Sequence, residues 1–181
     1  STEWLAQHLK DPNIVVLDCN WYLPELNKQG IDDYRSGHIP GARFFDLNVI
    51  SDKASPYINM LPPADQFADE VGKLGIGNDK QVVVYDATYV SARIWWMFRV
   101  YGHDNVRILD GGWKLWKAQG RPVETGIPAS PPPATFTPHP RANSVASWQD
   151  VLNAIKTKAA TLGISLRKPG SNGGRRQKDR G

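Results

Sequence analysis

Gln81-Val82-Val83-Val84-Tyr85 is the strongest β-strand signal in the sequence. Valine and tyrosine favour an extended backbone, and an apolar run without polar alternation is typical of a strand that is buried on both faces. Such strands occur in parallel sheets that helices cover on each side. We therefore expect this segment near the centre of a parallel sheet.

Strand and helix patterns alternate along the rest of the chain. Apolar runs predict three further strands, at residues 14–17 followed by Asp18, at 43–46 and at 106–109. Helical spacing predicts helices at residues 2–8, 31–36, 62–74 and 91–102, the last capped by Ser91, and one more after the turn Asp110-Gly111-Gly112. Strands separated by helices of this length indicate right-handed crossovers. The expected fold class is α/β, with three α/β/α layers around a mostly parallel central sheet.

The composition is that of an ordinary globular domain. Of the 181 residues, 40% are apolar and 22% are charged, which excludes a chain that is disordered throughout. No apolar run approaches the roughly 18 residues of a membrane helix, and the first residues lack the basic and apolar regions of a signal peptide. We expect a soluble protein that does not bind membranes, located in the cytoplasm, or in mitochondria if the source is eukaryotic.

The net charge of +4 comes from the end of the chain. Arg167 to Gly181 contains six basic residues and one acidic residue, which leaves the first 166 residues close to neutral. This stretch also contains four glycines and no aromatic, leucine, isoleucine or valine residue, so it cannot bury enough surface to offset the entropy of ordering. We expect residues 164–181 to form a basic, glycine-rich, disordered tail. Without aromatic residues to stack on bases, specific nucleic-acid binding is not expected.

The loop Asp86-Ala87-Thr88-Tyr89-Val90-Ser91 is the first place to look for a functional site, because sites in parallel sheets lie beyond the carboxyl ends of the strands. A loop that leads into a helix N-terminus can hold a phosphate, a thiolate or a persulfide. Its first residue, Asp86, is no sulfur nucleophile. A single cysteine and four scattered histidines give no metal-binding pattern, so we expect no metal and no cofactor.

Several single residues allow a chemical and a structural interpretation. Cys19 is a candidate nucleophile, but a lone cysteine after a buried strand is more often a packed side chain. His38 is a candidate acid or base, although a turn-fixing hydrogen bond is the simpler role. Asp110 could bind an anion or a metal, or cap the following helix. Four tryptophans at helical spacing are expected in the core and in domain packing: Trp95, Trp96, Trp113 and Trp116.

Four motifs occur in order along the chain: Asp18-Cys19-Asn20-Trp21-Tyr22-Leu23-Pro24; Gly37-His38-Ile39-Pro40-Gly41-Ala42; Ser55-Pro56-Tyr57 with Met60-Leu61-Pro62; and Asp110-Gly111-Gly112-Trp113. Together they resemble the N-terminal domain of tandem rhodanese-type sulfurtransferases, closest to the 3-mercaptopyruvate and thiosulfate sulfurtransferases. The resemblance runs from Ser1 to about residue 125 and resumes faintly at residues 147–162.

The resemblance implies a rhodanese-like fold and a non-catalytic role. In that family the catalytic cysteine lies in the second domain, and the first domain carries an aspartate that Asp86 matches. The family transfers sulfur from 3-mercaptopyruvate or thiosulfate to a thiol or cyanide, so the partner of the full-length protein is a small sulfur-containing substrate. The first domain lends side chains to the cleft between the domains, and the matching residues here are Trp21, Tyr22, Pro24 and Tyr89.

The expected organisation has four parts. Residues 1–125 form a rhodanese-like domain, 126–143 a proline-rich linker, 144–163 the start of a truncated second repeat, and 164–181 the tail. A missing C-terminal rhodanese domain would leave an apolar face bare, which self-association into a homo-oligomer could cover. Alternatives are a stand-alone binding or regulatory module, a single-domain enzyme that uses Cys19, and nucleic-acid association through the tail.

Deletion of residues 167–181 should leave the melting temperature nearly unchanged, because this stretch has no side chains that could extend the core. Thermal unfolding followed by circular dichroism of the full and shortened chains checks this. A large loss of stability would mean that the tail docks on the body.

Overall fold

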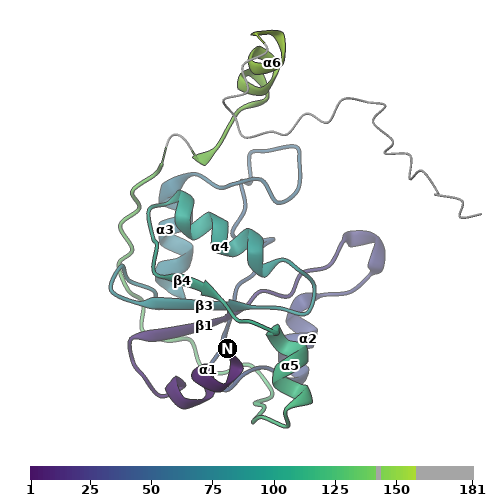
Figure 1. Ribbon diagram of the computed structural model, residues 1–181, viewed down its shortest axis with the longest axis vertical. Helices are drawn as coiled ribbons and strands as arrows, with labels where there is room; N and C mark the ends of the chain where they lie inside the picture. The colour runs from purple at the N-terminus through teal and green to yellow at the C-terminus, as the bar shows by residue number, and fades with distance from the viewer. Residues whose placement is uncertain (142–143, 158–181) are drawn as a thin grey trace, which may run out of the picture. The chain divides into compact units, whose positions relative to one another are not determined.

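The computed structural model describes residues 1–141 and 144–157 and shows a four-stranded parallel sheet (Figure 1). The strands are β1 (Ile14–Asp18), β2 (Arg43–Phe44), β3 (Gln81–Tyr85) and β4 (Val106–Ile108). Their order across the sheet is β2-β1-β3-β4, and each neighbouring pair runs parallel. β3 pairs with β1 and β4, so its predicted central place is confirmed.

Side chains of the two inner strands alternate between two cores. Val15 and Leu17 of β1 share one core with Val82 and Val84 of β3. The helices α3 (Ala64–Lys73) and α4 (Ser91–Val100) cover this core, and Figure 1 shows them above the strands. Its largest buried members from the helices are Phe67, Ile94, Met97 and Phe98.

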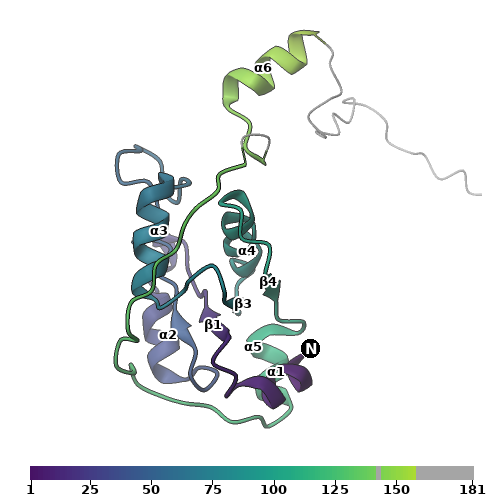
Figure 2. The same cartoon turned by 90° about the vertical axis from the view of Figure 1, so that its left-hand side faces the viewer.

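The opposite face of the sheet carries the second core. Val16, Val83 and Tyr85 point into it. The helices α1 (Thr2–His8), α2 (Gly30–Ser36) and α5 (Gly112–Ala118) cover it with Leu5, Tyr34, Trp113 and Trp116. Helices on both faces of a parallel sheet make the three-layer α/β/α fold that the sequence predicts (Figure 2).

Two helix ends differ from the expectations. α4 begins at Ser91, whose predicted capping role is wrong, because the residue at the N-cap is Val90. α5 is preceded by Gly111 with φ of 80° and has no side-chain cap, so the prediction that Asp110 caps it is wrong as well. A left-handed glycine turns the chain here, a conformation that Gly adopts without steric cost.

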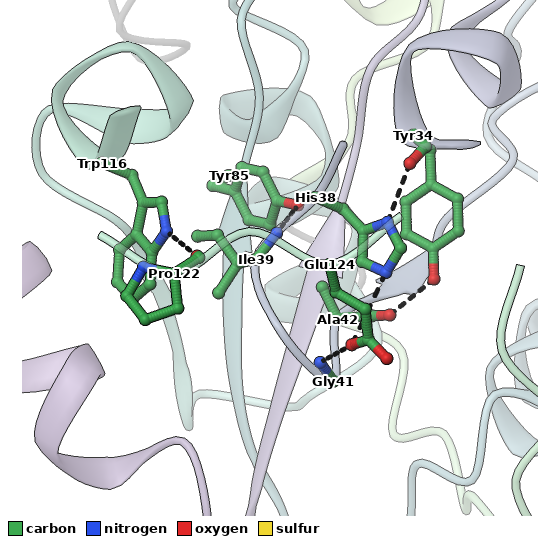
Figure 3. A network of polar contacts seen from close by, with 9 residues as sticks. All are labelled: Tyr34, His38, Ile39, Gly41, Ala42, Tyr85, Trp116, Pro122 and Glu124. Atoms are coloured by element: carbon green, nitrogen blue, oxygen red, sulfur yellow. Dashed lines mark hydrogen bonds and ion pairs between the residues drawn. The ribbon is translucent and has the colours of Figure 1, made fainter. Parts of the chain in front are cut away.

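The turn at residues 38–42 is held by a polar network around His38 (Figure 3). The His38 Nδ1 lies 2.8 Å from the Tyr34 carbonyl oxygen, and the two rings stack with centroids 4.0 Å apart. Because a carbonyl only accepts, Nδ1 carries the proton. The Nε2 of His38 lies 3.8 Å from the Glu124 carboxylate, which also accepts the Gly41 N–H at 2.8 Å. The turn-fixing role of His38 is confirmed.

The proline-rich segment after α5 packs along the body and passes α3 in Figure 2. Main-chain bonds join Gly126 to Arg35, Ala134 to Gly72, His139 to Tyr101 and Arg141 to Val100. Phe136 is 5% exposed and lies in the core of α3 and α4. Residues 126–141 therefore belong to the same compact unit as residues 1–125. That the segment connects two domains stays a prediction.

The second compact unit contains the helix α6 (Trp148–Thr157), close to its predicted place. Ser147 and Asp150 close a reciprocal cap, in which the Ser147 Oγ accepts the Asp150 N–H at 3.1 Å and the Asp150 carboxylate accepts the Ser147 N–H at 2.8 Å. Its apolar residues Trp148, Leu152 and Ile155 are exposed. The rest of the predicted second repeat and the tail lie outside the described residues.

Phe136→Ala should lower the free energy of unfolding by about 3–5 kcal/mol, because it opens a cavity in a tightly packed aromatic core. Phe136 contacts Phe67, Phe98 and His103, with ring centroids 5.8, 6.3 and 5.8 Å away. Chemical denaturation measures the loss. Ile127→Ala is the matched control, since Ile127 lies in the same segment but is 58% exposed, and its effect should stay within about 0.5 kcal/mol. Equal small effects of both changes would contradict the assignment of the segment to the core.

Candidate functional site

The carboxyl ends of β1 and β3 lie side by side, because the two strands pair in register from Ile14 with Gln81 to Asp18 with Tyr85. The loops that follow them, residues 19–23 and 86–90, therefore meet at one edge of the sheet. A hydrogen bond from the Ala87 N–H to the Asn20 side-chain oxygen, 2.8 Å long, joins the two loops. This edge is where parallel sheets place their functional sites.

Asp86 is fixed by the first residue of α4. Its Oδ2 accepts the Ser91 N–H at 2.8 Å, and its Oδ1 accepts the Ser91 hydroxyl at 3.1 Å. The carboxylate therefore accepts a hydrogen bond from one of the backbone N–H groups that lack a partner within the helix. It also lies at the positive end of the helix dipole, where a negative charge is favoured. The Asp86 carboxylate thus takes the position at the helix N-terminus that a bound anion could otherwise take.

Tyr89 stands out from the same loop. Its backbone adopts φ of 83°, a conformation rare for residues other than glycine, and its side chain is 93% exposed. It borders a hollow of about 440 Å³ together with Asp86, Ser91, Ile108, Gly111 and Lys114. Tyr89 therefore lies at the carboxyl edge of the sheet, and its place in a cleft between two domains stays a prediction.

Cys19 is unsuited to nucleophilic chemistry. Its side chain is 1% exposed and lies in the core of α3 and α4, where the thiol donates to the Leu17 carbonyl at 3.6 Å. Burial raises the pKa of the Cys19 thiol well above its ordinary value, and the negative charges of Asp18 and Asp86 raise it further. A thiol without its thiolate form is a poor nucleophile. The structural interpretation of Cys19 fits these surroundings.

Asp18 is a buried acid at the end of β1. It is fully buried, its Oδ1 accepts the Asn20 N–H at 3.0 Å, and its Oδ2 has no hydrogen-bond partner among the described residues. Burial raises the pKa of Asp18 from 3.8 to about 6, and the charges of Asp86 and Asp33 add to this. The hydrogen bond from the Asn20 N–H opposes the rise in pKa.

The other three residues predicted to line a cleft follow β1. The Trp21 indole donates to Asn48 at 2.8 Å, and Pro24 opens the short 3-10 helix η1 (Pro24–Leu26). The Tyr22 hydroxyl donates to the Asp33 carboxylate, and the Lys28 ammonium lies 5.1 Å from the centre of the Tyr22 ring. Trp21, Tyr22 and Pro24 share a small hollow of about 160 Å³, which Tyr89 does not border.

A third hollow at this edge, of about 400 Å³, includes residues that the sequence did not single out for a site. Tyr22 and Asn20 form one wall, Asp33 of α2 another, and Trp113 and Lys117 of α5 a third. Asp33 and Lys117 carry no motif signal, because they reach the hollow only through the packing of α2 and α5 on one face of the sheet.

Across residues 1–141 and 144–157, no group of three or more His, Cys, Asp or Glu residues is placed to hold a metal ion. In the same residues, no helix has the length and apolarity to cross a membrane.

Asp18→Asn should stabilise the protein increasingly as the pH rises. The pKa of Asp18 is raised to about 6 in the folded protein, so the native state holds this proton more tightly than the unfolded chain. The parent therefore loses stability as the pH rises from about 4 through 6, and the neutral amide does not, a difference of up to about 3 kcal/mol. Melting temperatures between about pH 4 and 8 test this, with the exposed Asp32→Asn as control. A pH-independent difference would contradict the raised pKa.

Comparison with known proteins relates this geometry to a family. The chain is 42% identical over 170 residues to thiosulfate sulfurtransferase of Bos taurus, covering 90% of this chain and 57% of the relative. It is 38% identical over 166 residues to 3-mercaptopyruvate sulfurtransferase of Homo sapiens, covering 87% of this chain and 56% of the relative. The chain thus spans a little over half the length of these curated relatives.

Solved structures show the same fold. A crystal structure of SseA from Escherichia coli, a 3-mercaptopyruvate sulfotransferase with the rhodanese fold, superposes with a TM-score of 0.81 at 35% identity, over 87% of this chain and 61% of that one. The Tum1 protein from Saccharomyces cerevisiae superposes with a TM-score of 0.74 at 26% identity, over 87% of this chain and 55% of that one. The family model for the rhodanese-like domain matches residues 1–119. With this match over more than half of its length, the chain belongs to the family of rhodanese-like domains.

Proposed function

We propose that this chain forms the N-terminal, non-catalytic domain of a rhodanese-family sulfurtransferase whose second domain carries the cysteine nucleophile. The reaction moves a sulfur atom from thiosulfate or 3-mercaptopyruvate onto a cysteine thiolate as a persulfide, and then to cyanide or a thiol. The names of the relatives in Bos taurus and Homo sapiens support this substrate class.

The state of Asp86 is the observation that carries the proposal. A nucleophile in the loop after β3 would have to be an anionic sulfur that is free to attack a substrate. Asp86 stands at the first position of that loop, and Ser91 occupies both of its carboxylate oxygens. A carboxylate cannot store sulfur as a persulfide, so this loop supports a structural role.

The surroundings of Cys19 support the same conclusion independently. It is the sole cysteine of the sequence, so any persulfide on this chain would have to form on it. Its thiol is buried and its pKa is raised by burial and by two neighbouring carboxylates. Neither thiosulfate nor 3-mercaptopyruvate, both anions, would approach a buried thiol beside Asp18 and Asp86.

The proposed contribution of this domain is one wall of a cleft that it shares with the second domain. Trp21, Tyr22 and Tyr89 lie in loops at the carboxyl edge of the sheet, Pro24 begins η1, and these residues offer the aromatic and apolar surface for that wall. Further exposed apolar side chains in the described residues lie in η1 or in loops between strands and helices: Leu23, Leu26, Tyr57, Ile58 and Met60. Exposed apolar side chains of this size support a surface that another domain or a second copy covers.

The purified chain should show no sulfur transfer above background, with thiosulfate and cyanide or with 3-mercaptopyruvate and a thiol. Asp86→Cys should restore little, because one domain still lacks the second wall of the cleft. Product formation, thiocyanate in the first assay and sulfide in the second, measures both proteins. Turnover that disappears in Cys19→Ser would contradict the proposal and make Cys19 the nucleophile.

A chimera separates the proposed role from a stand-alone binding module. In it, residues 1–141 of this chain replace the first rhodanese domain of the Bos taurus relative, which is 42% identical to this chain. The proposal expects a folded chimera that transfers sulfur, and a control that lacks the relative's catalytic cysteine should be inactive. A chimera that folds but stays inactive would favour the stand-alone module.

A further inference from the structure

The hollow of about 400 Å³ at the carboxyl edge of the sheet has opposite charges on its walls. Its volume lies in the usual range for pockets that hold small molecules, about 300–1,000 Å³. α2 supplies Asp33 to it and α5 supplies Trp113 and Lys117. The hollow is therefore a candidate site for a ligand that carries more than one kind of group.

The wall around Asp33 is negative. The Asp33 Oδ2 accepts the Tyr22 hydroxyl, and its Oδ1 has no hydrogen-bond partner among the described residues. The pKa of Tyr22 is raised to about 12, first by this hydrogen bond, then by burial, and further by the charges of Asp33, Asp18 and Asp86. Asp33 is thus the carboxylate that lines this end of the hollow, and its charge favours a cationic group there.

The wall around Lys117 is positive. The Lys117 ammonium lies 5.2 Å from the centre of the Trp113 ring, a cation–π contact. Within residues 1–141 and 144–157, no carboxylate lies within salt-bridge distance of it. A carboxylate on a ligand would supply the missing counter-ion, and Trp113 and Val123 add apolar surface beside it.

We propose that this hollow binds a small zwitterion of the α-amino acid class, with its ammonium group at Asp33, its carboxylate at Lys117 and its side chain against Trp113 and Val123. A simple anion would meet the carboxylates at one end, and a simple cation would meet Lys117 at the other. A metal ion is a poorer fit, because no group of three or more His, Cys, Asp or Glu side chains in the described residues is placed to coordinate one. The proposal does not depend on sulfur transfer.

L-phenylalanine is a suitable probe, since it combines both charges with an apolar side chain. The measurement is the shift of the Trp113 indole N–H signal in nitrogen-15 spectra of the full chain, assigned with Trp113→Phe. We expect saturable binding with a Kd of about 1 mM or tighter. N-acetyl-L-phenylalanine lacks the ammonium group and L-phenylalanine amide lacks the carboxylate, and each should bind at least about tenfold more weakly, the cost of one lost ionic contact.

Variants assign each charge to its wall. Lys117→Gln should weaken L-phenylalanine about tenfold and leave the affinity for the amide unchanged, because the amide offers Lys117 no carboxylate. Asp33→Asn should weaken L-phenylalanine similarly and leave the N-acetyl compound unchanged. The matched controls are Lys114→Gln on α5, which borders a different hollow, and the exposed Asp32→Asn on α2. Neither control should change any affinity.

Three results would overturn the proposal. One is the absence of a saturable shift up to about 10 mM L-phenylalanine. Another is equal binding of the three compounds, which would mean that only the apolar contact contributes to the affinity. The last is an equal loss of affinity for L-phenylalanine in Lys114→Gln and Lys117→Gln, which would mean that the net charge of the protein, and not Lys117 itself, determines the affinity. Melting curves of each variant show that it is folded, so a lost signal reports on the site itself.

Discussion

The in-register pairing of β1 with β3 is the constraint on which the rest of the structure depends. Both strands are apolar on both faces, so they must lie between two layers of helices. The polar residues at the carboxyl ends of the two strands are also constrained in position, because parallel strands that pair in register end at the same edge of the sheet. Asp18 and Asp86 therefore lie near enough for the charge of Asp86 to raise the pKa of Asp18. The loops that follow the two strands meet through Asn20 and Ala87, which are 67 positions apart in the sequence. The electrostatics of this edge follow from the pairing of two apolar strands.

The crowding of acids decides which chemistry the edge can perform. Asp86 accepts hydrogen bonds from the Ser91 N–H and hydroxyl at the start of α4, and its negative charge disfavours the ionised form of its buried neighbours. Burial raises the pKa of Asp18 and of the Cys19 thiol, and the charge of Asp86 adds to both rises. The edge thus combines a carboxylate that is hydrogen-bonded to α4 with a buried cysteine whose thiolate form is disfavoured. This combination supports the non-catalytic role that we propose.

The sequence predicted the parts of the fold that depend on local pattern. The valine run of β3 and the apolar periodicity of α3 and α4 were sufficient to predict these elements, because a buried face produces a regular pattern of apolar residues along the sequence. Asp110 misled, since the start of α5 depends on the left-handed backbone of Gly111 rather than on a capping side chain. In the candidate site, Tyr22 could be named in advance from its motif. Asp33 and Lys117 could not, because α2 and α5 bring them to one hollow only in the folded chain.

The proline-rich segment shows that a composition typical of linkers does not keep a segment away from the body of a domain. Prolines make a segment extended, and the same property lets it lie flat along a surface and form isolated main-chain bonds. They also reduce the entropy of the unfolded chain, so docking such a segment costs less than docking a flexible one. Phe136 is the residue of this segment that is buried in the core, where its ring lies near three others. It thus links a mostly exposed segment to the packing of α3 and α4, and the main-chain bonds of Ala134, His139 and Arg141 hold the backbone beside it.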